Sequence, residues 1–137
     1  MQLSIPIGLI FLSVVGVAGA MSPFTPEDIR FFEEKVRPVL ADNCLMCHGT
    51  RKAESGLRLH SREAVLRGSD FQRVVDLQLP EKSPLLLSIR HADGIEPMPS
   101  DEPKLASEDI AALDEWIRRG LPWPDGEPEA VAVDAKE

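Results

Sequence analysis

Aromatic residues and long apolar runs are both scarce in this sequence. It has five Phe, two Trp and no Tyr in 137 residues, so a core of this size is modest unless another group helps to fill it. Outside the N-terminal segment no apolar run suggests a membrane span. The chain carries 12 Pro and 9 Gly, which favours short helices separated by turns over long helices or a sheet. We therefore expect a small, loop-rich, all-α domain.

Basic residues are also fewer than acidic ones. Fifteen Lys and Arg face 23 Asp and Glu, for a formal net charge of −8. A protein that binds nucleic acid needs a basic face, and no basic run is present, so we expect no nucleic-acid partner. The acidity suits solubility, and it would also steer a partner protein with a basic docking patch toward this chain.

The N-terminal segment resembles a signal peptide. Residues 5–17 are almost wholly apolar, and Ala18-Gly19-Ala20 supplies the small residues that a signal peptidase recognises. No Lys or Arg precedes this run and Pro6 lies near its start, so an uncleaved anchor is the competing interpretation. The run falls short of the roughly 20 residues that span a bilayer. We expect a signal peptide over 1–20, a domain over 21–125, an acidic disordered tail over 126–137, and export to the periplasm.

Helix signals recur along the predicted domain. Thr25 as N-cap and Pro26 at the first position start a helix, and Phe32, Val36 and Leu40 form an apolar stripe on it. Pro38 predicts a kink or break, followed by a helical turn that carries the next motif. Further helices are expected over Ser61–Leu66, from Ser83-Pro84 through Ile89, and from Ser107 to Gly120.

Both cysteines of the chain lie in one motif, Cys44-Leu45-Met46-Cys47-His48. The spacing C-x-x-C-H is the attachment signature of a c-type haem: two thiols form thioether bonds to the porphyrin and the imidazole binds the iron. Three residues at i, i+3 and i+4 can converge on one planar ligand. A structural zinc site would need four ligands in other spacings, and a redox dithiol would need an α/β setting. Covalent haem is therefore the favoured interpretation.

The iron ligands follow from the same residues. His48 is expected to bind iron through one ring nitrogen while the other donates to a backbone carbonyl. On the opposite face the candidates are Met98, His91 and His60, because Met46 should point away. Met98, held between Pro97 and Pro99, is preferred. His91 is the alternative, although at a helix end it would suit a solvent-facing imidazole, and His60 is expected on the surface.

Several further segments resemble one family. They are Phe32 to Leu40, Gly49 after the motif, Gly56 to Leu59, Glu81-Lys82-Ser83, Ile89-Arg90, Met98-Pro99, and Ile110 through Trp116 to Pro124. Together they look like the planctomycete-type cytochrome c domain over roughly residues 28 to 125. Two places depart from its pattern: Ser100 stands where a second proline usually follows Met-Pro, and residues 70–79 lack the usual Gly-Pro turn.

The resemblance implies a class I cytochrome c-like helical fold wrapped around one covalent haem c. Cys44 and Cys47 would carry the thioethers, with His48 as proximal and Met98 as distal ligand. The function we expect is that of a monohaem c-type cytochrome that transfers single electrons to a redox partner and is not an enzyme. The alternative is a haem-bearing subunit docked on a larger periplasmic oxidoreductase. A haem enzyme or gas sensor with a labile sixth ligand is a third hypothesis.

Overall fold

The computed structural model describes residues 22–126 and is all-helical, with no strand in that range. The elements in chain order are α1 (Pro26–Phe31), the π-helical η1 (Phe32–Val36), α2 (Arg37–Asn43), the 3₁₀ turn η2 (Glu54–Gly56), α3 (Arg62–Arg67), the 3₁₀ turn η3 (Pro80–Lys82), α4 (Pro84–Ile89) and α5 (Ser107–Arg118). The all-α prediction is confirmed. The predicted signal peptide and nearly all of the predicted tail lie outside the described residues. Within them no helix has the length and hydropathy of a membrane span.

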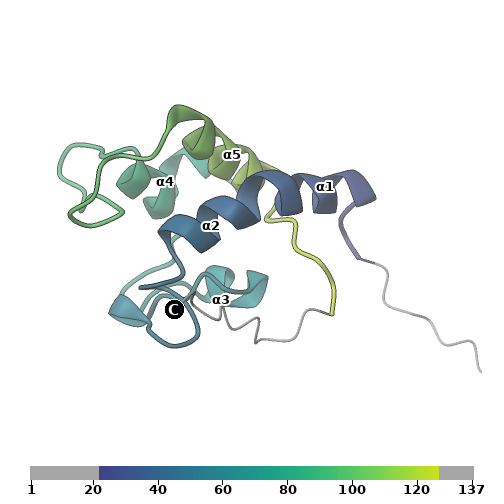
Figure 1. Ribbon diagram of the computed structural model, residues 1–137, viewed down its shortest axis with the longest axis horizontal. Coiled ribbons are helices and arrows are strands. Elements are labelled where there is room, and N and C mark those ends of the chain that lie inside the picture. The colour runs from purple at the N-terminus through teal and green to yellow at the C-terminus, as the bar shows by residue number, and fades with distance from the viewer. Residues whose placement is uncertain (1–21, 127–137) are drawn as a thin grey trace, which may run out of the picture.

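The elements α1, η1 and α2 follow one another as a single bent rod (Figure 1). Its start is a capping box, because the Thr25 hydroxyl accepts from the Asp28 N–H at 3.1 Å and the Asp28 carboxylate accepts from the Thr25 N–H at 3.1 Å. The break predicted at Pro38 is a π-helical segment that ends at Val36. The helix restarts at Arg37, so Pro38 lies in a first turn where no backbone donor is required.

The apolar stripe of this rod packs against α5 and the segment that follows it. Phe32, Val36 and Leu40 are buried, and the Phe32 ring lies 6.0 Å from the Trp116 ring and 4.4 Å from the Trp123 ring, centroid to centroid. Trp116 donates its indole N–H to the Pro122 carbonyl at 2.9 Å. The three aromatic rings therefore form the centre of the core, and Trp123 closes it.

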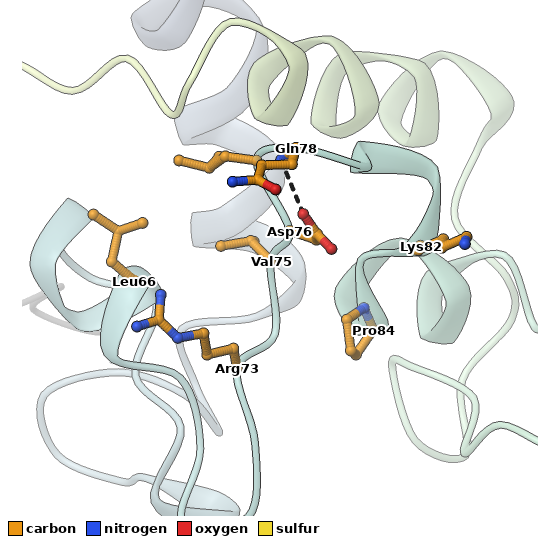
Figure 2. A pocket seen from close by; sticks show the side chains of 8 residues that line it. Leu66, Arg73, Val75, Asp76, Gln78, Lys82 and Pro84 are labelled. Carbon is orange, nitrogen blue, oxygen red and sulfur yellow. Dashed lines mark hydrogen bonds between the residues drawn. The ribbon is translucent and has the colours of Figure 1, made fainter.

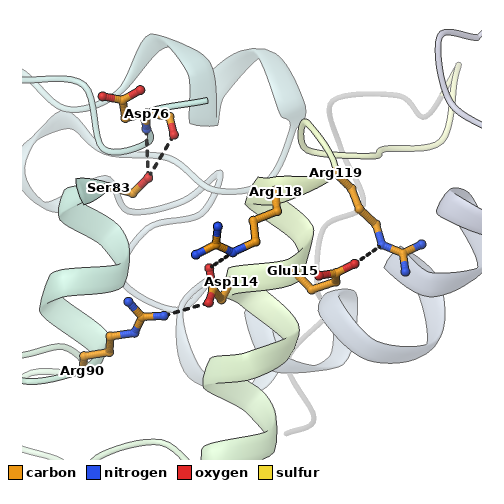
Figure 3. A network of polar contacts seen from close by, with 7 residues as sticks. All are labelled: Asp76, Ser83, Arg90, Asp114, Glu115, Arg118 and Arg119. Atoms are coloured by element: carbon orange, nitrogen blue, oxygen red, sulfur yellow. Dashed lines mark hydrogen bonds and ion pairs between the residues drawn. The ribbon is translucent and has the colours of Figure 1, made fainter. Parts of the chain in front are cut away.

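Ion pairs connect the helices around this core. Asp114 of α5 binds Arg90 at the end of α4 at 2.9 Å (Figure 3), and Arg119 binds Asp28 of α1 at 3.2 Å. Solvent-exposed pairs of this kind add little to stability. Their role is to orient α4 and α1 against α5 more than to stabilise the fold.

The segment without the Gly-Pro turn is built around Asp76. Its carboxylate oxygen Oδ1 accepts from the N–H groups of Gln78 and Leu79, both at 2.9 Å, which makes an Asx turn. These bonds hold the pKa of Asp76 below its usual value. Ser83 was expected to cap α4 with its side chain. Its hydroxyl instead accepts from the Asp76 N–H at 2.9 Å and makes no cap bond (Figure 3).

Trp116→Phe should lower the free energy of unfolding by about 1–3 kcal/mol, because the Pro122 carbonyl loses its donor inside the core. Denaturant unfolding followed by circular dichroism measures this. Trp123→Phe is the matched control, since it removes similar ring area but leaves that bond in place. Equal losses in the two variants would contradict a role for the hydrogen bond.

Asp76→Ala should lower the melting temperature at neutral pH, because the turn loses its acceptor. The folded-state pKa of Asp76 is depressed, so its contribution is present above the ordinary value of 3.8 and is lost as the pH falls below it. The gap in melting temperature between wild type and Asp76→Ala should therefore close in acid. Asp76→Asn keeps an acceptor oxygen and should retain more stability than Asp76→Ala at neutral pH. A gap independent of pH would rule out the carboxylate as its source.

Candidate haem-attachment site

The Cys44 to His48 motif forms a chain of tight turns directly after α2. The Cys44 N–H still bonds the Leu40 carbonyl at 2.9 Å, and the His48 N–H bonds the Cys44 carbonyl at 2.9 Å. The sequence predicted a helical turn here, and the His48-to-Cys44 bond closes a single turn of that kind, although α2 itself ends at Asn43. The backbone leaves the helical region at Cys44, which has φ −126°, and His48 instead pairs with Ala53 in an isolated antiparallel bridge. The His48-to-Cys44 bond nevertheless keeps the three candidate haem contacts together.

The loop from Gly49 to Leu59 folds back on the motif and holds it with hydrogen bonds. The His48 carbonyl accepts from the Leu59 N–H at 2.8 Å, and the Cys47 carbonyl accepts from the Glu54 N–H at 3.0 Å. Arg58 donates from one guanidinium nitrogen to the carbonyls of Gly49 and Thr50, at 2.6 and 2.7 Å. These hydrogen bonds hold the backbone of the motif in place, and we call the motif braced in this sense.

Gly49 is required by this bracing. A Cβ at this position would collide with the backbone carbonyl of Leu45 inside the motif, and backbone cannot move aside as the tip of a side chain can. No role for Gly49 or Arg58 could be predicted from the residues alone. Both lie in segments that resemble the family, but their contacts depend on how the loop closes.

The two thiols are half-buried and form no disulfide. Burial, with a smaller effect from neighbouring Cys47, raises the pKa of Cys44 to about 12. A protonated thiol is a poor nucleophile and a poor metal ligand. The environment of Cys44 therefore disfavours its thiolate form.

His48 is buried, and its ring nitrogen Nδ1 is shielded from solvent without a hydrogen-bond partner among residues 22–126. The expected donation from the second ring nitrogen to a backbone carbonyl is not seen there. A buried imidazole with an unpartnered ring nitrogen, next to two thiols that form no disulfide, fits the donor set of a c-type haem.

Met98 faces inward although its loop is exposed on either side. Its side chain is half-buried and packs against the same core cluster as Cys44 and Leu45. The Met98 N–H bonds the Ser88 carbonyl of α4 at 3.1 Å, and the Ser100 hydroxyl donates to the Met98 sulfur at 3.4 Å. Ser100, which replaces the proline usual in the family pattern, thus contacts the atom that would bind iron. Met98 and the motif share one core, as the preferred ligand assignment requires.

The other candidate side chains lie differently from what the sequence predicted. His91 was expected to face solvent, but it is half-buried and its Nε2 atom is shielded, with no hydrogen-bond partner in the described part of the chain. His60 was expected on the surface, but both of its ring nitrogens are shielded from solvent. Met46 is 88 % exposed and points away, as expected. The expectation of a solvent-facing imidazole at the helix end was therefore wrong for His91.

A pocket of about 390 Å³ opens between α3 and α4 (Figure 2). Its lining residues are Leu66, Arg73, Val75, Asp76, Leu77, Gln78, Lys82 and Pro84. Arg73 lies on the α3 side, and Lys82 and Pro84 lie on the α4 side. Neither the motif nor Met98 lines this pocket, so it is distinct from the candidate ligation site.

A small all-helical fold with a C-x-x-C-H turn and a methionine that packs against the same core is the arrangement expected of a c-type cytochrome. The model of the family described as Planctomycete cytochrome C matches residues 44–102, which include Cys44, Cys47, His48 and Met98. This match confirms the predicted family resemblance over residues 44–102, and a cytochrome c domain indicates haem and electron transfer in general. No curated protein and no solved structure matches the chain.

Gly49→Ala should lower the fraction of purified protein that carries covalent haem, because the added Cβ forces the motif turn open at Leu45. The ratio of haem absorbance to protein mass measures this. Gly94→Ala is the control: a Cβ there meets nothing within 4 Å, and only its φ of +76° opposes the change. Equal haem content in the two variants would show that the close approach does not matter for attachment.

Proposed function

We propose that this chain is a monohaem c-type cytochrome that transfers single electrons outside the cytoplasmic membrane. The observation that carries the proposal is the motif turn, which gathers Cys44, Cys47 and His48 into one braced unit against the core. In this proposal Cys44 and Cys47 hold the haem through thioethers. His48 and Met98 bind the iron from opposite faces.

The haem, when bound, supplies one-electron redox chemistry at its iron. The residues of this chain decide what that iron can do. With His48 and Met98 both as iron ligands, no position would remain for oxygen or peroxide, and the thioether of Met98 would raise the reduction potential. This ligand set supports electron transfer and argues against a haem enzyme or gas sensor.

Burial around the motif supports the same function. Leu59 is buried, and Leu57 and Leu85 pack against the same core. Apolar side chains next to a haem exclude water and raise its potential by disfavouring the more highly charged oxidised state. Part of this burial serves the fold alone, as in any small core.

Charge is distributed unevenly over the chain, and this supports a partner with a basic docking patch. Residues 93–115 contain eight acidic side chains and one basic, whereas residues 51–73 contain six basic and three acidic. Asp93, Glu96, Asp101 and Glu102 are exposed on the Met98 loop. A basic partner would therefore be steered toward the loop that carries the distal ligand, in a salt-dependent way.

The second candidate function is a haem subunit docked on a larger periplasmic enzyme. It is favoured by two large apolar side chains on the surface, Met46 and Phe71, which are 88 % and 83 % exposed. Isolated exposed residues are common, so this observation is weaker than the first. Co-elution of the native protein with a larger polypeptide would support the subunit, and elution as a monomer would support the carrier.

Met98→Ala should abolish the weak sulfur-to-iron charge-transfer band of the oxidised protein. It should also lower the reduction potential, because the thioether ligand that raises this potential is removed. Visible spectroscopy and redox titration measure both. Ser100→Ala is the matched control: it keeps the thioether and removes only the hydroxyl at 3.4 Å from the sulfur, so the band should remain. A band that survives in Met98→Ala would refute the distal assignment.

A further inference from the structure

His91 and Met98 lie at the two ends of one short loop that is closed at its base by a single carbonyl oxygen. The Ser88 carbonyl accepts from the backbone N–H of His91 and from the backbone N–H of Met98, each at 3.1 Å. The two backbone nitrogens are therefore separated by no more than twice that distance. The two candidates for the distal ligand, His91 and Met98, thus lie close together along the backbone of this loop.

The backbone of this loop is held by its own hydrogen bonds. The Ala92 N–H bonds the Leu87 carbonyl at 3.0 Å, and the Ile95 N–H bonds the Ala92 carbonyl at 3.1 Å. Together with the two bonds to Ser88, these contacts anchor the loop on the last turn of α4. The backbone positions of His91 and Met98 are therefore both fixed relative to α4.

The His91 side chain is turned inward at a cost. Its Nε2 atom is shielded from solvent without a partner among the described residues, which is unfavourable for a buried polar group. Its backbone φ of +54° belongs to the end of α4, where the His91 N–H bonds the Ser88 carbonyl and the Ala92 N–H bonds the Leu87 carbonyl. The unpartnered Nε2 atom has no such explanation, because a side chain that only ends a helix would place its imidazole in water.

We propose that His91 is a reserve ligand of the haem iron, which takes the axial position on the Met98 side whenever the thioether is not bound. This rests on the proposed function, because it requires haem held at Cys44, Cys47 and His48. Imidazole and thioether are both established types of axial haem ligand. His91 would keep the iron six-coordinate and closed to small molecules, at a lower potential than with Met98.

The test is the spin state of the oxidised iron in purified, haem-loaded variants, read by electron paramagnetic resonance at neutral pH. Met98→Ala should stay low-spin, with His91 as the new ligand, and Met98→Ala/His91→Ala should become high-spin. Met98→Ala/His60→Ala is the matched control and should stay low-spin. His91→Ala alone should keep the charge-transfer band of the wild type. If Met98→Ala does not retain haem, Met98→Leu keeps the apolar bulk and replaces it throughout.

The outcomes separate this proposal from the proposed function. Absence of covalent haem or of the charge-transfer band in the wild type would defeat the proposed function. With both present, a high-spin Met98→Ala overturns the reserve role, and so does a low-spin Met98→Ala/His91→Ala. A high-spin Met98→Ala/His60→Ala assigns the ligand to His60 and also overturns it. Loss of the band in His91→Ala would show that His91 acts in the resting state and not as a reserve.

Discussion

The hydrogen bond from the His48 N–H to the Cys44 carbonyl, 2.9 Å long, is the contact on which the site depends. It closes the turn that brings two thiols and one imidazole to the same place, and the Leu59 N–H then fixes His48 from the other side. The rest of the fold supports this unit. The π-helical segment allows α2 to restart at Arg37 and to end immediately before Cys44, and the aromatic core of Phe32, Trp116 and Trp123 holds the rod in place.

Much of this fold could be predicted from the sequence, because its helices begin with strong local signals. Thr25-Pro26, the Ser61 cap and the stripe of α5 all depend on residues within a few positions of each other, and the structure confirms them. The turn around Asp76 could not be predicted in the same way. A segment without Gly and Pro gives no turn signal of the usual kind, and the Asx turn depends on one carboxylate that accepts from two nearby N–H groups.

The candidate site, too, could be predicted only in part. C-x-x-C-H identifies its residues by spacing alone, whereas the shielding of the ring nitrogens of His91 and His60 depends on the folded chain. The end of a helix predicted a solvent-facing His91. The structure shields its Nε2 atom instead, at the base of the loop that the His91 and Met98 N–H groups close on the Ser88 carbonyl.

The central claim is that two sulfurs of this chain bind one haem covalently. The mass of the intact protein after extraction in acidic organic solvent tests it most directly, because thioether bonds survive conditions that remove a haem held only by its iron ligands. Protein matured by a host with a haem-attachment system should show the mass of the polypeptide plus one haem, together with the visible spectrum of a c-type cytochrome. The mass of the polypeptide alone, in a colourless sample, would contradict the account.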